Sequence, residues 1–209
     1  MTDFAAQSRG EHEAQFFQLE RYLRSLVGES EDRRSQAWKR DFSGLEAYER
    51  SVEPNRERLL KMLGVASLPG GLSLREEALP PCGPHQASRI WISGIDGVET
   101  YGIVLRPPGG GPLPAVIAQH GLGGSPELVC GLVEPPDCHR HFGRTLAEDG
   151  YLVLAPLVIN NTVERVWLDR LAITVGYRLV GLEVLKIRQA VRYLQGRDDV
   201  VPERVGIYG

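Results

Sequence analysis

The stretch AVIAQHGLGGSP, residues 115–126, decides the fold of this chain. Residues 115–119 are mostly apolar and unbroken, as expected for a strand that is buried on both faces of a sheet. Three of the five residues in the loop 120–124 are glycines, so its backbone can adopt positive φ values and a ligand can approach the main chain closely. The stretch therefore predicts that backbone N–H groups lie at the carboxyl edge of a sheet, where α/β proteins bind ligands.

Strands alternate with helices after this stretch. Apolar runs at 151–157 and 204–208 predict two further strands, and helices are expected at 139–148, 163–174 and 177–195. This alternation predicts a parallel sheet with right-handed crossovers. Residues at helical spacing are expected to form the apolar faces of the last two helices, namely Val166, Trp167, Leu171 and Ala172 in one and Val180, Val184, Ile187, Val191 and Leu194 in the other.

A hairpin is predicted before the stretch. Two β-rich runs, 89–95 and 98–105, flank Asp96-Gly97, which is a strong short-range turn signal. The Pro- and Gly-rich residues 107–112 can form neither strand nor helix, and residues 72–79 are expected to contain a short edge strand. The fold class is therefore α/β, with a mostly parallel sheet that begins with an antiparallel hairpin.

The amino-terminal part of the chain is predicted to be helical over residues 11–64. Gly28 is expected to end the first helix, Pro54 to begin a later helix at its first turn, and Gly64 to end that helix. We assign residues 1–70 to a small helical appendage and residues 71–209 to the main domain.

The composition is that of an ordinary globular protein. The chain has 209 residues, of which 42% are hydrophobic and 24% charged, and its net charge of −3 without basic runs favours no nucleic-acid partner. It begins with Met and has neither an apolar signal region nor a run long enough to span a bilayer, so a cytoplasmic protein without a membrane partner is expected. Its three cysteines are expected to be free thiols.

The ordered elements resemble the first half of an α/β-hydrolase, of the dienelactone hydrolase and acetyl-xylan-esterase-like kind. The resemblance implies that Gly209 is the first glycine of the G-x-S-x-G nucleophile elbow, with the serine, the acid and the catalytic histidine further along. On this expectation the 209 residues alone have no hydrolase activity. Four segments carry the resemblance: RIWISGIDGVETYGIVLRPPG (89–109), AVIAQHGLGG (115–124), HFGRTLAEDGYLVLAPL (141–157) and GLEVLKIRQAVRYLQGRDDVVPERVGIYG (181–209).

The resemblance also implies where the site lies. Gly121 and Leu122 would form the oxyanion-hole loop, with the Leu122 N–H as one donor. Asn160, Asn161 and Arg165 follow a parallel strand and are expected to face the substrate pocket, with the two asparagines as candidate substrate-binding residues, although a solvated loop with Asx turns is the alternative. His120 is included as a pocket residue, but within this fold it is expected to hold the loop by hydrogen bonds rather than to act as a base. A purely structural turn remains the alternative for the whole loop.

Several other residues are expected to have structural roles. Ser125 precedes a proline and is expected to cap a helix or a turn. The spacing of Cys130, Cys138, His139 and His141 does not match a zinc site, and neither a metal nor a cofactor is expected. An ion pair is expected between Asp169 and Arg170. Glu183 is expected to be half-exposed or to pair with Arg178 or Lys186.

We therefore predict a serine hydrolase that acts on a small-molecule carboxylic ester through an acyl-enzyme. A peptidase or amidase of the same fold is the first alternative. A non-catalytic incomplete fragment or binding module is the second. The sequence predicts no oligomeric state.

Overall fold

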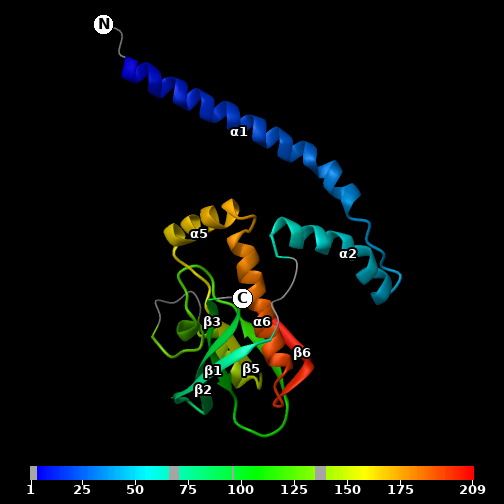
Figure 1. Cartoon of the computed structure of the whole chain (residues 1–209), viewed down its shortest axis with the longest axis vertical. Helices are drawn as coiled ribbons and strands as arrows, with labels where there is room; N and C mark the ends of the chain where they lie inside the picture. Colours follow the sequence, from blue (N-terminus) through cyan, green and yellow to red (C-terminus); the bar gives the residue numbers. More distant parts are fainter. Residues whose placement is uncertain (1–3, 66–70, 96, 135–139) are drawn as a thin grey trace. The chain divides into compact units, whose positions relative to one another are not determined.

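The computed structural model describes residues 4–65, 71–95, 97–134 and 140–209 (Figure 1). The chain divides into two compact units, residues 1–59 and 60–209. The first unit contains α1 (Phe4–Ala37) and most of α2 (Leu45–Met62). No helix of the described part is long and apolar enough to cross a membrane.

Both amino-terminal helices differ from the prediction at their ends. Gly28 lies inside α1 and does not end it, and Pro54 lies inside α2 instead of beginning a helix. Long-chain and charged residues with good helix propensity surround Gly28, so one glycine is tolerated at a cost of about 1 kcal/mol. Gly64 follows the end of α2 with a φ of 74°, as expected for a glycine that terminates a helix.

The second unit is built on a six-stranded sheet with the order β1-β2-β3-β5-β4-β6. The neighbouring pairs β1–β2, β2–β3 and β3–β5 are antiparallel, and β4 pairs in parallel with both β5 and β6. The hairpin is confirmed, and the edge strand before it is longer than predicted. The strands are β1 (Ser73–Cys82), β2 (His85–Ile95), β3 (Val98–Arg106), β4 (Leu113–Ala118), β5 (Leu152–Pro156) and β6 (Val200–Tyr208).

Helices cover both faces of this sheet. One core cluster joins Ile117 and Leu154 to residues of α6 (Leu179–Gln195), and the other joins Ala118 and Val153 to α3 (Pro126–Val129) and α4 (Phe142–Glu148). Successive residues of a strand point to opposite faces, so α6 lies on one face and α3 and α4 lie on the other. The connections after β4 and β5 thus leave toward opposite faces, which makes the carboxyl ends of these two strands a switch point where α/β folds bind ligands.

The predicted apolar faces of the last two helices are only partly correct. In α5 (Thr162–Thr174), Val166, Trp167 and Leu171 are exposed and only Ala172 is buried. In α6, Val180 is exposed, and the buried residues follow a neighbouring stripe. That stripe contains small residues, which let the helix approach its neighbours more closely than the β-branched stripe would. The buried residues of α6 are Leu179, Gly181, Leu185, Gln189, Ala190, Tyr193 and Leu194.

Candidate functional site

The glycine-rich loop after β4 begins with a tight turn over residues 121–124. Gly124 N–H donates to Gly121 O at 3.1 Å, and Gly123 has a φ of 79°. A turn with a positive φ at its third position but not at its second is a type II turn, and glycine is the preferred residue at the third position. Leu122 occupies the second position, and its side chain is exposed.

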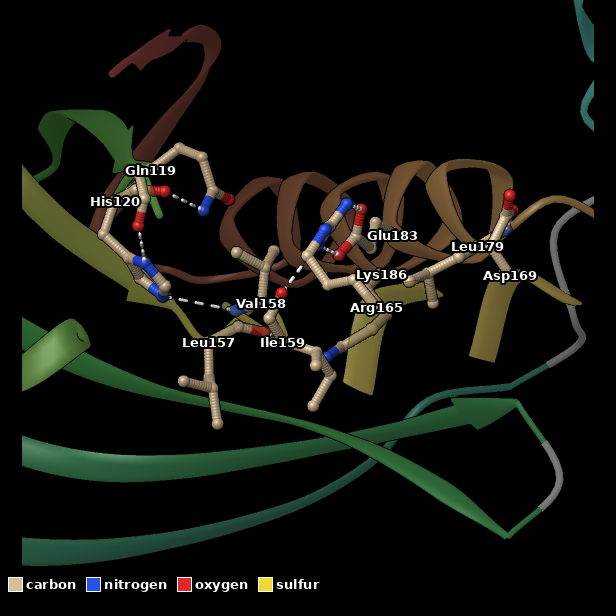
Figure 2. Close-up of polar contacts among 11 residues, drawn as sticks. Gln119, His120, Leu157, Val158, Ile159, Arg165, Asp169, Leu179, Glu183 and Lys186 are labelled. Atoms are coloured by element: carbon tan, nitrogen blue, oxygen red, sulfur yellow. Dashed lines mark hydrogen bonds and ion pairs between the residues drawn. The ribbon is translucent and has the colours of Figure 1, made fainter. Parts of the chain in front are cut away.

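His120 fixes one peptide of this turn. The ring is 3% exposed, and its Nε2 accepts a hydrogen bond from Val158 N–H at 3.3 Å (Figure 2). Because Nε2 is the acceptor, the proton of the neutral ring resides on Nδ1. Nδ1 lies 2.9 Å from Gly121 O and therefore donates to it. These contacts agree with the prediction that His120 holds the loop.

The two bonds to Gly121 O determine where the next N–H points. The chain contains no cis peptide among the described residues, and in a trans peptide the carbonyl and the N–H point in opposite directions. With Gly121 O held by His120 and Gly124, the N–H of Leu122 points away from both. The structure shows no acceptor for this N–H among the residues that it describes. The loop thus presents a free, oriented donor.

The segment after β5 completes the support of the loop. The side-chain amide of Asn160 donates to Gly124 O, and Asn161 Oδ1 accepts from Val163 N–H at 2.9 Å and Glu164 N–H at 3.3 Å. Asn161 is therefore the N-cap of α5. Asn160 therefore contacts the loop, Asn161 caps the helix that follows, and both bind backbone groups of the protein.

An ion pair fixes the same segment from the other side (Figure 2). Arg165 binds both carboxylate oxygens of Glu183, and its Nη1 also donates to Ile159 O at 2.6 Å. Lys186 Nζ donates to Leu157 O at 2.9 Å. Glu183 is thus partly buried and pairs with Arg165, not with Arg178 or Lys186, because α5 brings Arg165 to it from 18 residues away in the sequence. Hydrogen bonding to Glu183 raises the pKa of Arg165, whereas burial lowers the pKa of Lys186.

The predicted pair between Asp169 and Arg170 is replaced by one between Asp169 and Arg178. Arg178 Nε lies 3.0 Å from Asp169 Oδ1, and Nη2 lies 2.7 Å from Oδ2. Asp169 Oδ1 also accepts from Leu179 N–H at 2.9 Å, so α5 supplies a cap for the first turn of α6. The bonds to Arg178 and Leu179 lower the pKa of Asp169. Adjacent residues of a helix point in different directions, which excludes the predicted pair.

The carboxyl end of β6 lies directly beside the loop. Gln119 N–H donates to Tyr208 O at 2.8 Å, and a Cβ built on Gly209 would lie 2.4 Å from Gln119 O. A residue other than glycine would therefore clash with the backbone at position 209. The ends of β4, β5 and β6 meet at this point of the sheet.

The remaining sequence candidates are structural or lie outside the described residues. Ser125 Oγ accepts from Leu128 N–H at 3.2 Å and caps α3, which confirms the predicted role. Cys82 and Cys130 are free and buried, and burial raises the pKa of Cys130. Cys138 and His139 lie outside the described residues, and among the described ones no three potential ligands form a metal site.

A separate cavity of about 480 Å³ lies on the sheet face that α3 and α4 cover. It is lined by the end of β1 and by Glu127, which accepts a hydrogen bond from Tyr101. None of the predicted site residues lines this cavity.

Sequence reasoning missed the roles of Val158 and Lys186 at the loop. The only signal for Val158 is its place after a parallel strand, and the only signal for Lys186 is its place beside the apolar stripe of α6.

The fold is that of known α/β-hydrolase esterases. A proposed acetyl xylan esterase from Bacteroides fragilis has a TM-score of 0.62 and 13% identity, covering 78% of this chain and 47% of its own. A glucuronoyl esterase from Solibacter usitatus has a TM-score of 0.52 and 13% identity, covering 79% and 53%. The methylesterase BT1017 has a TM-score of 0.52 and 16% identity, and the match covers 80% of this chain and 37% of that protein.

The chain spans about half the length of these structures or less. No protein-family model matches it, and no curated protein matches it. The predicted α/β-hydrolase fold, in its partial form, is confirmed by the first of these structures and by the observed sheet.

Proposed function

We propose that this chain provides the oxyanion-binding part of a serine hydrolase that cleaves carboxylic esters. The observation that carries the proposal is the peptide between Gly121 and Leu122. Its carbonyl is held by two donors, and its N–H is left without a partner at the carboxyl end of β4. In α/β-hydrolases one oxyanion donor comes from a loop that follows a strand of the central sheet, which supports assigning this role to the Leu122 N–H in the loop after β4.

The proposed mechanism assigns different roles to the predicted residues. Leu122 N–H stabilises the negative charge that develops on the carbonyl oxygen when the ester is attacked. One such preorganised donor is worth roughly 3–4 kcal/mol of barrier lowering. His120 and Asn160 already bind backbone groups of the loop, so we assign them to positioning the donor rather than to binding substrate. Asn161 caps α5 and is assigned no contact with substrate.

The nucleophile belongs to the turn that follows β6 in this fold. There an elbow raises a serine beside the oxyanion loop. Two features support this placement: the hydrogen bond from Gln119 to Tyr208, and the close approach of Gly209 to Gln119, which only glycine permits. The reaction is then acyl transfer to the serine, followed by hydrolysis of the acyl-enzyme by water.

The substrate class rests on the names of the structures with the same fold. An acetyl xylan esterase, a glucuronoyl esterase and a methylesterase all cleave carboxylic esters by name. A small-molecule carboxylic ester is therefore the proposed substrate.

The test removes the donor while keeping the turn. Proline is favoured at the second position of a type II turn and has no N–H, so Leu122→Pro deletes the donor at a position that accepts proline. In the full-length protein, kcat for a 4-nitrophenyl ester should fall by about 10²–10³. Leu122→Ala, which keeps the N–H, should lose far less. Equal losses in the two variants, or no ester hydrolysis by the parent protein, would overturn the proposal.

A further inference from the structure

We propose that Glu183 and Lys186 of α6, together with Arg165 of α5, are positioning residues of the oxyanion loop. They hold the backbone on both sides of Val158, so that its N–H fixes the tautomer of His120 and thereby the direction of the Leu122 N–H. This inference rests on the proposed function for its catalytic meaning. Its structural part can be tested without any activity.

The first step is the pair of anchors around Val158. Lys186 Nζ binds Leu157 O at 2.9 Å, and Arg165 Nη1 binds Ile159 O at 2.6 Å (Figure 2). The carbonyls immediately before and after Val158 are therefore both tied to cationic side chains of the neighbouring helices. Hydrogen bonds from charged donors are shorter and stronger than neutral ones, so the segment has little freedom to rotate.

The second step is the role of Glu183. It engages both terminal nitrogens of Arg165, which fixes the plane of the guanidinium and directs Nη1 at Ile159 O. The side chains of Arg165 and Glu183 are only 27% and 14% exposed, so water competes weakly for this pair. A planar fork bound at two points is held in orientation as well as in position. Glu183 thus acts on the loop through Arg165.

The third step links this segment to the loop. Val158 N–H reaches His120 Nε2 at 3.3 Å, which requires a lone pair on Nε2 and a proton on Nδ1. Only that tautomer can donate to Gly121 O. If Val158 shifts, Nε2 loses this donor, and with it the bond that favours the tautomer protonated on Nδ1. The Gly121 carbonyl then loses one of its two donors, and the Leu122 N–H loses its fixed direction.

The variants are chosen to keep shape while removing the interaction. Glu183→Gln keeps the size of the side chain and removes its charge, and Lys186→Met keeps the apolar stem and removes the donor. Lys186→Arg restores a donor and serves as the rescue. Glu148→Gln is the matched control, because it weakens an exposed pair with Arg144 on α4, away from this network.

The readout is the ring-nitrogen spectrum of His120 from long-range ¹H–¹⁵N NMR, assigned by the loss of its signals in His120→Gln. The parent and Glu148→Gln should show one fixed tautomer with Nδ1 protonated. Glu183→Gln and Lys186→Met should show ring nitrogens whose shifts move toward each other, and Lys186→Arg should restore the separation. If Lys186→Met does not fold, the isosteric Glu183→Gln decides alone.

Unchanged His120 shifts in a folded Glu183→Gln variant would overturn the inference, whatever the activity. In the full-length protein the same variants should lower kcat with little change in KM, because the donor acts mainly in the transition state. Altered shifts together with unaltered kcat would overturn the catalytic part. Altered shifts in a protein without any esterase activity would refute the proposed function and leave the positioning role standing.

Discussion

Gly181, in the first turn of α6, provides a direct test of how the helix packs. A Cβ built at this position would lie 2.4 Å from Leu63 O and 3.0 Å from Leu63 Cβ. The same Leu63 carbonyl accepts a hydrogen bond from Arg178 N–H at 3.2 Å, next to the start of the helix. Gly181→Ala therefore forces α6 away from a backbone atom that cannot move aside independently.

Two opposing terms set the magnitude. Replacing glycine by alanine inside a helix stabilises it by up to about 1 kcal/mol. Overpacking against a fixed neighbour typically costs about 1–3 kcal/mol. A contact at 2.4 Å is far shorter than the contacts that real Cβ atoms make, so we expect the clash to dominate. The net loss should reach about 2 kcal/mol, which corresponds to a fall of roughly 4–8 °C in Tm at about 2–4 °C per kcal/mol.

Gly196, at the other end of α6, supplies the matched control. Its φ is −90°, and a Cβ there would meet Arg192 O at 3.5 Å and Tyr193 O at 3.7 Å, which are ordinary contacts. Gly196→Ala should be neutral or stabilising by up to about 1 kcal/mol, because it restricts the unfolded chain. Urea unfolding of both variants, followed by circular dichroism, gives the comparison. Equal stability of the two variants would refute the packing argument.

Three further predictions concern the loop and its surroundings. Asn161→Ala should cost about 1 kcal/mol in urea unfolding and Asn161→Asp much less, because Asp can still cap α5. Gly123→Ala should cost about 1–2 kcal/mol for its positive φ, whereas Gly110→Ala, in open space, should cost less. Burial, reinforced by Glu127, raises the pKa of Tyr101 to about 12 from 10.0, so the folded state keeps a proton that the unfolded state releases. The free energy of unfolding should therefore fall as the pH rises from about 10 to about 12, as measured by urea unfolding at each pH. In Tyr101→Phe the fall should be less steep.

The sequence was sufficient for the parts of the fold that local chemistry determines. The two strands of the hairpin, the glycine loop and the apolar strands β4 and β5 each carry a local signal, and all lie where they were predicted. The failures at Gly28 and Pro54 concern residues that usually interrupt helices but are tolerated when their neighbours favour helix. The exposed face of α5 was missed because periodicity shows that a helix has an apolar stripe, not what covers the stripe.

The site was predictable only in part for a different reason. The sequence identified His120 and Asn160 by their place after parallel strands, and both bind backbone groups of the loop. Their partners are backbone atoms, and backbone atoms leave no signature in a sequence. The pairing of Glu183 with Arg165 joins two side chains and was missed for another reason, because the path of the chain between α5 and α6 decides which cation lies beside Glu183.

Because backbone groups hold the oxyanion loop in place, the residues that supply those groups can be exchanged more freely than the side chains that bind them. The side chains that hold the loop, those of His120, Asn160, Arg165 and Lys186, all bind main-chain groups. The side chains of residues 157–159 make none of these bonds, so apolar exchanges there should leave the donor in place. An exchange of His120 for another residue would instead remove an acceptor and a donor together. The amides of Asn and Gln also offer a donor and an acceptor in one plane, but both groups leave from the same carbon, so they do not reproduce the divergent directions of the two ring nitrogens.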